Sequence, residues 1–177
     1  MIFWKRCGIL SVTLGYNLEK IGANAFCNCK NLKSIYGLEN VRVIGNNAFK
    51  GDKSLTAANL SAARTIGKNA FSGCKALKSV KLGSKLTAIA DGAFQNCTAL
   101  KKITIPAKVT KIGAKAFCKC KALAGITVKA AKIKTVGKDA FKGISKKVVF
   151  SCPTKKLAKN YKKIFQKAGA PKSGTWK

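Results

Sequence analysis

The chain has 177 residues, of which 36 are Lys or Arg, 5 are Asp or Glu and none is His, so its formal net charge at pH 7 is +31. Without histidine or paired carboxylates, the sequence lacks a catalytic triad and an acid–base pair, and it has no glycine-rich phosphate loop. No stretch approaches the roughly 20 consecutive apolar residues of a membrane-spanning helix. These observations predict a protein that is not an enzyme, binds no cofactor and no metal, and has no membrane span.

A repeated pattern runs through most of the chain. Its consensus is Ile-Gly-x-x-Ala-Phe-x-x-Cys-x-x-Leu-x-x-Ile-x-Ile, and successive copies begin 22 to 24 residues apart. A fixed period of this length is typical of solenoids, in which each unit buries its apolar face against its neighbours. The pattern predicts about seven stacked layers of ~23 residues in a single domain that serves as a binding surface. The copies open at Ile21, Ile44, Ile66, Ile89, Ile112 and Val136.

The chain begins inside a repeat. Phe3 takes the Phe position, Ile9 the Leu position and Val12 a strand position, which predicts a truncated first layer. The alternative is a weak signal peptide, in which Lys5 and Arg6 precede a short apolar run. That run contains Ser, Thr and Gly, and no small-residue cleavage site follows it. We therefore expect no signal peptide in this chain, and expect further repeats and an export signal upstream.

Each full layer divides into two parts with different periodicity. In the layer that opens at Ile89, the segment Leu100-x-x-Ile103-x-Ile105 ends in strict alternation, which predicts a short strand. One strand per layer predicts a parallel sheet along the solenoid. Residues 67–77 do not alternate and predict a turn followed by a helical or 3₁₀ segment. The Gly after the opening Ile predicts a tight turn or close contact between layers, although Ala90 at this position shows that a positive φ is not required.

A phenylalanine follows a small residue at the same point of every copy. These rings are expected to stack as one buried column, each contributing roughly 1.5–3 kcal/mol. The column consists of Phe26, Phe49, Phe71, Phe94, Phe117 and Phe141.

The copies IGKNAFSGCKALKSVKLGSKLTAIADGAF and IADGAFQNCTALKKITIPAKVTKIGAKAF resemble the BspA-like leucine-rich repeats, which occur in surface and secreted proteins of bacteria and of some parasitic protists. The resemblance covers residues 3 to about 150. It implies a right-handed leucine-rich-repeat solenoid of the α/β horseshoe-like, β-rich class. It also implies a secreted or cell-surface protein used in adhesion or partner binding. The family has no shared catalytic residues.

Four of the eight cysteines share one repeat position, which predicts small, buried, reduced side chains without metal. Zinc is disfavoured because the Cys-x-Cys pairs at 27–29 and 118–120 have one intervening residue instead of two to four, and no His is present. Disulfides are possible because adjacent layers bring Cα atoms near bonding range, but stacked side chains run parallel. The four are Cys29, Cys74, Cys97 and Cys120.

Asp52 occupies the Cys position of the second full layer. A lone buried carboxylate is costly. Either the turn opens to water there, or Lys53 or a backbone N–H satisfies the carboxylate. A functional acid is the other interpretation.

Residues 153–177 are predicted to form a basic capping helix and tail, which leaves residues 1–152 as the solenoid. Leu157, Tyr161, Ile164, Phe165 and Ala168 follow helical spacing, and Gly and Pro end the pattern at positions 169 and 171. A basic amphipathic helix can also dock on a membrane or a partner. We expect a cap, because a solenoid needs its last layer covered.

Strand alternation identifies an outward face that is rich in small hydroxyl residues, with one aromatic residue and a central basic pair. Such a face suits a glycan or a protein loop, although an ordinary solvated sheet face has the same composition. The candidate ligand-binding residues are Ser34, Tyr36, Asn59, Ser79, Lys81, Lys102, Thr104 and Thr127.

The sequence thus predicts a non-catalytic extracellular or cell-surface binding module that contacts an unidentified protein or glycan, as a monomer or as part of a longer chain. The alternative is non-specific binding of anionic polymers such as teichoic acid, sulfated glycan or nucleic acid, and a third possibility is a structural spacer. The charge comes almost entirely from Lys instead of the Arg favoured for phosphate recognition. It is spread over the layers, and strand aromatics are scarce, which disfavours a nucleic-acid stacking platform.

Overall fold

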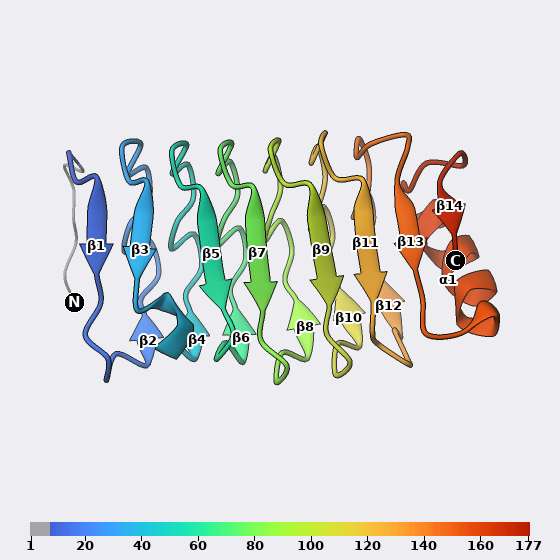
Figure 1. Ribbon diagram of the computed structural model, residues 1–177, viewed down its shortest axis with the longest axis horizontal. Coiled ribbons are helices and arrows are strands. Elements are labelled where there is room, and N and C mark those ends of the chain that lie inside the picture. Colours follow the sequence, from blue (N-terminus) through green and yellow to red (C-terminus); the bar gives the residue numbers. More distant parts are fainter. Residues whose placement is uncertain (1–7) are drawn as a thin grey trace.

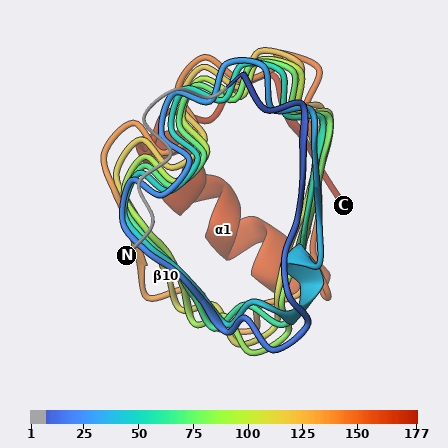
Figure 2. The ribbon, with the colours of Figure 1, turned by 90° about the vertical axis from the view of Figure 1, so that its left-hand side faces the viewer.

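The computed structural model describes residues 8–177, so the expectations for Phe3, Lys5 and Arg6 lie outside the described residues. The chain forms a parallel-strand solenoid of about seven turns with one helix near its C-terminal end. The layers follow one another in a nearly straight row, and they superpose when viewed along that row (Figures 1 and 2). The predicted leucine-rich-repeat type of solenoid is confirmed.

The predicted strand is present in each layer, and these strands lie side by side along one face (Figure 1). They are all parallel and pair in register in three groups: β1 with β3, β5 with β7, and β11 with both β9 and β13. The strands of this row are β1 (Ser11–Thr13), β3 (Ser34–Tyr36), β5 (Ala57–Leu60), β7 (Ser79–Leu82), β9 (Lys102–Ile105), β11 (Gly125–Val128) and β13 (Val149–Ser151).

A second row of two-residue strands ends at the Ile or Val that opens each repeat, so the expectation of one strand per layer was incomplete. Backbone bonds such as Gly45 N–H to the Ile21 carbonyl, at 2.9 Å, link consecutive layers here. A short 3₁₀ turn, Leu38–Asn40, precedes the second of these strands. The row comprises β2 (Lys20–Ile21), β4 (Val43–Ile44), β6 (Thr65–Ile66), β8 (Ala88–Ile89), β10 (Lys111–Ile112) and β12 (Thr135–Val136).

Residues 67–77 form a series of turns, so the predicted turn is present, but the helical or 3₁₀ segment expected to follow it is not. Asn69 has φ 54° and Gly73 has φ 80°, and left-handed residues recur at these two positions in the other layers. They direct N–H groups to the next layer instead of along a helix. Phe71 N–H, for example, donates to the Ala93 carbonyl at 2.8 Å, and Phe94 N–H donates to Ala116 at 2.9 Å.

The glycine after the opening Ile makes close contact with the preceding layer at Gly45, Gly67, Gly113 and Gly137, whereas Gly22 is open and Ala90 takes this position in one layer. A Cβ placed on Gly67 would lie 2.6 Å from the backbone nitrogen of Asn46 in the preceding layer. Gly67 does not have a positive φ. The prediction of close layer contact without left-handed geometry is therefore confirmed.

The phenylalanine column is the centre of the core. Consecutive rings from Phe26 to Phe141 stack with centroids 5.0–5.7 Å apart and interplanar angles of 17° or less. All six rings are buried. The predicted column is confirmed.

The cysteine column lies beside the rings. The thiols of Cys74, Cys97 and Cys120 are fully buried and free, and each donates to a phenylalanine carbonyl at 3.0–3.1 Å. Burial raises the pKa of Cys74 and Cys97 above the ordinary thiol range. Cys29 is also buried but is disulfide-bonded, so the expectation that it is reduced was wrong. The close spacing of parallel layers permits such a bond.

The predicted cap is helix α1 (Lys155–Lys167), which crosses the end of the solenoid (Figure 2). The Thr154 hydroxyl accepts a hydrogen bond from Leu157 N–H at 3.2 Å and begins the helix. The Tyr161 hydroxyl donates to the Ala130 carbonyl at 3.0 Å. Ile164 was expected on the packed stripe but is 37% exposed.

After α1 the chain returns to the sheet. Strand β14 (Thr175–Trp176) pairs with β13 in parallel. Within residues 8–177, no helix has both the length and the apolar character needed to cross a bilayer.

Candidate functional site

The candidate ligand site is the outward face of the longer strands, which faces the viewer in Figure 1. Within each strand, core residues such as Ile103 and Ile105 point inward and the residues between them point outward. In-register pairing then aligns the outward residues in two rows. Asn59 pairs with Lys81 in one row, and Ser79 pairs with Ala57 in the other.

The structure brings all eight predicted ligand-binding residues to this face. Tyr36 is 60% exposed, which makes it the largest accessible side chain among them. Ser34 is half-buried. The remaining six, all exposed, are Asn59, Ser79, Lys81, Lys102, Thr104 and Thr127.

The basic pair lies on neighbouring strands, with Lys81 on β7 and Lys102 on β9. A Cβ placed on Gly125 would lie 3.1 Å from Cγ of Lys102, so the aliphatic part of Lys102 covers this glycine on β11. The ammonium group is left for solvent or a ligand. None of the five acidic residues of the chain occupies an outward strand position. The centre of the face is therefore positive.

The acidic side chains lie elsewhere. Glu19 pairs with Arg42 at 2.7 Å, in the region of the shorter strands. Asp91 and Asp139 approach lysines at 3.8 and 3.9 Å in the turns. These ion pairs are exposed and contribute little to stability.

Asp52 is fully buried in the cysteine column. The Cys29 backbone N–H donates to its Oδ1 at 2.8 Å, and its Oδ2 has no hydrogen-bond partner among the described residues. Burial raises the pKa of Asp52 to about 8, against the lowering effect of the Cys29 N–H. Of the expected ways to satisfy the Asp52 carboxylate, the hydrogen bond from a backbone N–H is present, whereas the turn does not open to water. Asp52 is a core group and has no access to a substrate.

The structure has two surface pockets that the sequence analysis did not predict. Thr127 and Ser151 line a hollow of about 370 Å³ at the end of β11 and β13. Extending the row Thr104–Thr127 by one layer leads to Ser151, so this residue could have been found from the repeat. Arg42, Arg64 and Lys85 line a second hollow, of about 310 Å³. Among residues 8–177 there is no group of three or more His, Cys, Asp or Glu placed to hold a metal ion.

The sequence matches the family model for the BspA-type leucine-rich repeat region. Six copies are found, in two overlapping matches at residues 2–124 and 54–169. No protein with a curated description matches the sequence.

Solved bacterial proteins share the fold. A leucine-rich repeat protein from Eubacterium ventriosum is 24% identical with a TM-score of 0.58, over 77% of this chain and 43% of that one. The T. pallidum leucine-rich repeat protein is 24% identical with a TM-score of 0.55, over 81% and 59%. A leucine-rich cell surface protein from Faecalibacterium prausnitzii is 24% identical with a TM-score of 0.50, over 70% and 48%. The chain thus spans about half the length of these proteins.

Proposed function

This chain belongs to the BspA-type leucine-rich repeat family, and from that premise we propose that it is a non-catalytic binding module, secreted or at the cell surface, whose protein or glycan partner contacts the strand face. The observation that supports this proposal is the in-register outward face, with exposed Tyr36 on β3 and a positive centre at Lys81 on β7 and Lys102 on β9. A flat, open face of this kind suits the extended surface of a macromolecule better than a small metabolite.

Adhesion or partner binding at the cell surface is the finer part of the proposal. It is supported by the cell-surface description of the F. prausnitzii protein with the same fold. The absence of catalysis is supported by the chain having no histidine and by the burial of Asp52 away from the face.

The experiment is a screen of purified protein against arrays of glycans and extracellular proteins, followed by titration of each hit at about 0.15 M salt. Tyr36→Ala should weaken a strand-face ligand by about 2 kcal/mol or more, because aromatic residues buried by a partner dominate such interfaces. Lys81→Ala and Lys102→Ala should each weaken it as well. Lys30→Ala, an exposed lysine outside the face, is the control and should leave binding unchanged. If the affinity of the ligand is unchanged in all three strand-face variants, the proposal is contradicted.

Non-specific polyanion binding is the second candidate, and the net charge of +31 favours it. Its affinity comes from counterion release and screened attraction, so it should fall steeply with salt. Retention on DNA and heparin columns between low and physiological salt measures this. If retention stays tight at physiological salt and is unchanged by substitution of Tyr36, Lys81 or Lys102, polyanion binding becomes the leading function.

A further inference from the structure

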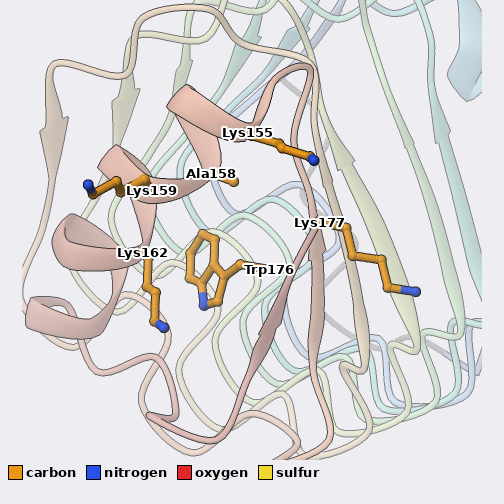
Figure 3. Close-up of a pocket in the computed structure, with 6 residues that line it drawn as sticks. All are labelled: Lys155, Ala158, Lys159, Lys162, Trp176 and Lys177. Carbon is orange, nitrogen blue, oxygen red and sulfur yellow. The ribbon is translucent and has the colours of Figure 1, made fainter.

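A pocket of about 590 Å³ opens at the C-terminal end of the solenoid, between α1 and β14 (Figure 3). It is distant in the fold from the central strand face, and an inference about it does not depend on the function proposed for that face. Its lining residues are Lys155, Ala158, Lys159, Lys162, Trp176 and Lys177.

The indole of Trp176 forms the apolar wall of this pocket. One ring face stacks on Phe150, with centroids 4.0 Å apart and an interplanar angle of 8°. β14 is the last strand of its sheet, so no described strand covers the other ring face. Phe165 of α1 also contacts the indole, with centroids 5.6 Å apart and an interplanar angle of 66°. The part of the indole that lines the pocket is the surface offered to a flat or ring-shaped ligand, and Figure 3 shows it beside α1.

The indole also has an unused hydrogen-bond donor. Its Nε1 is buried and has no acceptor among the described residues. A buried N–H without a partner is unfavourable, but at this depth a ligand in the pocket would reach the nitrogen only after the surrounding side chains move. In Figure 3 this nitrogen lies on the edge of the ring turned toward Lys162.

Four lysines line the pocket without an acidic side chain among the lining residues, and in Figure 3 the ammonium groups of Lys159 and Lys177 point away from the indole. Lys155, Lys159 and Lys162 follow i, i+4, i+7 spacing and so share one side of α1, over a rise of about 10 Å. Like charges at this spacing repel and destabilise a helix, and the helix contains no acidic residue to offset them. Figure 3 shows Lys155 and Lys162 on opposite sides of the indole. A ligand with several negative charges would remove this repulsion.

The chemistry of the lining restricts the ligand further. Ammonium groups and the indole N–H are donors only, and no side chain of the lining accepts a hydrogen bond. The amino donors of a nucleobase and the hydroxyl donors of a neutral sugar would find no side-chain acceptor in this lining. A sulfated or carboxylated saccharide presents mainly acceptors, together with an apolar C–H ring face for the indole.

We propose that the pocket between α1 and β14 binds an acidic oligosaccharide, with a sugar ring against Trp176 and its sulfate or carboxylate groups on the lysines of the lining. The site is discrete and lies at the cap. Binding at one defined site differs from the diffuse attraction of anions that the net charge produces over the whole surface.

The test is calorimetric titration of the full chain with a fully sulfated heparin tetrasaccharide at about 0.15 M salt. One-to-one binding is expected. The double variant Lys155→Gln/Lys162→Gln should weaken it by at least about tenfold, because hydrogen bonds to charged groups are lost. The matched control Lys30→Gln/Lys75→Gln removes the same charge at exposed positions outside the pocket and should change affinity by less than about twofold.

Trp176→Phe keeps an aromatic ring on Phe150 but removes part of the apolar wall of the pocket, and should weaken binding by about threefold or more. Tyr36→Ala should have no effect, which separates this site from the strand face. Thermal unfolding of each variant shows whether the cap is intact, and the result for Lys155→Gln/Lys162→Gln decides the proposal even if Trp176→Phe is unstable.

Three results overturn the proposal. One is no binding at physiological salt, and another is equal loss in the pocket and control variants, because either indicates a diffuse charge effect. The third is tighter binding of ATP, of the desulfated tetrasaccharide or of phosphatidylserine vesicles than of the sulfated probe, with the same dependence on Lys155 and Lys162. That result would assign the pocket to a nucleotide, a neutral glycan or a membrane.

Discussion

Phe141 of the last full repeat and Phe165 of α1 stack with ring centroids 4.6 Å apart and an interplanar angle of 24°. The helix therefore continues the ring column of the repeats. It also supplies the backbone acceptor that a further layer would have provided. Phe141 N–H donates to the Ala168 carbonyl at 3.0 Å, in the same way that Phe117 N–H donates to Ala140 at 2.8 Å.

Removing the ring that ends the column should uncap the solenoid. Phe165→Ala should lower the free energy of unfolding by about 3–5 kcal/mol, through lost burial and an unfilled cavity. Ile164→Ala is the control, because Ile164 is 37% exposed, and it should cost less than about 1 kcal/mol. Urea denaturation followed by circular dichroism measures both. Equal costs for the two variants would show that α1 does not act as a cap.

Deleting a ring in the middle of the column should be equally severe. Phe94 contacts Phe71 and Phe117 on its two sides, so Phe94→Ala should cost about 3–5 kcal/mol. The double variant Phe94→Ala/Phe117→Ala should differ from the sum of the single variants by about 0.5–3 kcal/mol, because the two rings share a contact. Strict additivity would contradict a continuous packed column.

Asp52 should make stability depend on pH. Its pKa is about 8 in the folded chain against an ordinary value of 3.8, so its protonated form is favoured by folding. This contribution is complete below pH 3.8, falls as pH rises toward 8, and is absent above that range. The slope in this window should approach about 1.4 kcal/mol per pH unit.

The measurement compares unfolding free energies of the wild type and Asp52→Asn from pH 4 to 9. Asparagine keeps an acceptor for the Cys29 N–H but does not ionise, so the difference between the two proteins isolates Asp52. Asp139→Asn is the control at a more exposed carboxyl and should leave the slope unchanged. A wild-type slope that survives in Asp52→Asn would refute the assignment.

The thiols of the cysteine column should resist modification in the native protein. Cys74, Cys97 and Cys120 are fully buried, while Cys27 and Cys152 are half-buried. Reaction requires the thiolate and access to it, so the column should react at least about a hundredfold more slowly than Cys152. Thiol titration with and without guanidinium, followed by peptide mapping, measures this. Rapid native labelling of Cys97 would contradict the buried column.

The core and the cap could be predicted from the sequence because their residues recur at one spacing. Phe71, Phe94 and Phe117 occupy equivalent positions, and identical environments select identical side chains. Tyr161 and Phe165 follow helical periodicity, which a single helix packed on one side requires. Both patterns depend on burial of apolar groups, the strongest signal in a sequence.

The turns could not be predicted in the same way. Their left-handed positions hold Asn69 or Asn96 in some layers, but Lys115 or Gly73 in others. Backbone hydrogen bonds between layers stabilise this conformation, so a lysine is tolerated where glycine or asparagine is usual. A backbone interaction of this kind leaves little trace in side-chain patterns.

The strand face followed directly from alternation, so Tyr36, Lys81 and Lys102 were placed on it from the sequence. The pocket at the cap was not predicted, because it depends on contacts made once in the chain. Trp176 lies beyond the repeats, and only its pairing with β13 brings it beside Lys155 and Lys162.

In the turns around the phenylalanines, N–H groups such as that of Phe71 donate to carbonyls of the next layer, whereas N–H groups such as those of Gly45 and Ala76 donate to the layer before. Joining two copies head to head would place the donors of these turns against donors. A whole repeat unit inserted in tandem instead finds, in the layers on both sides, the same donors and acceptors that every other layer finds. Gene duplication can therefore change the length of this protein without redesigning any contact. The number of layers is free to vary between relatives, while the helix that ends the stack needs to match only the last layers.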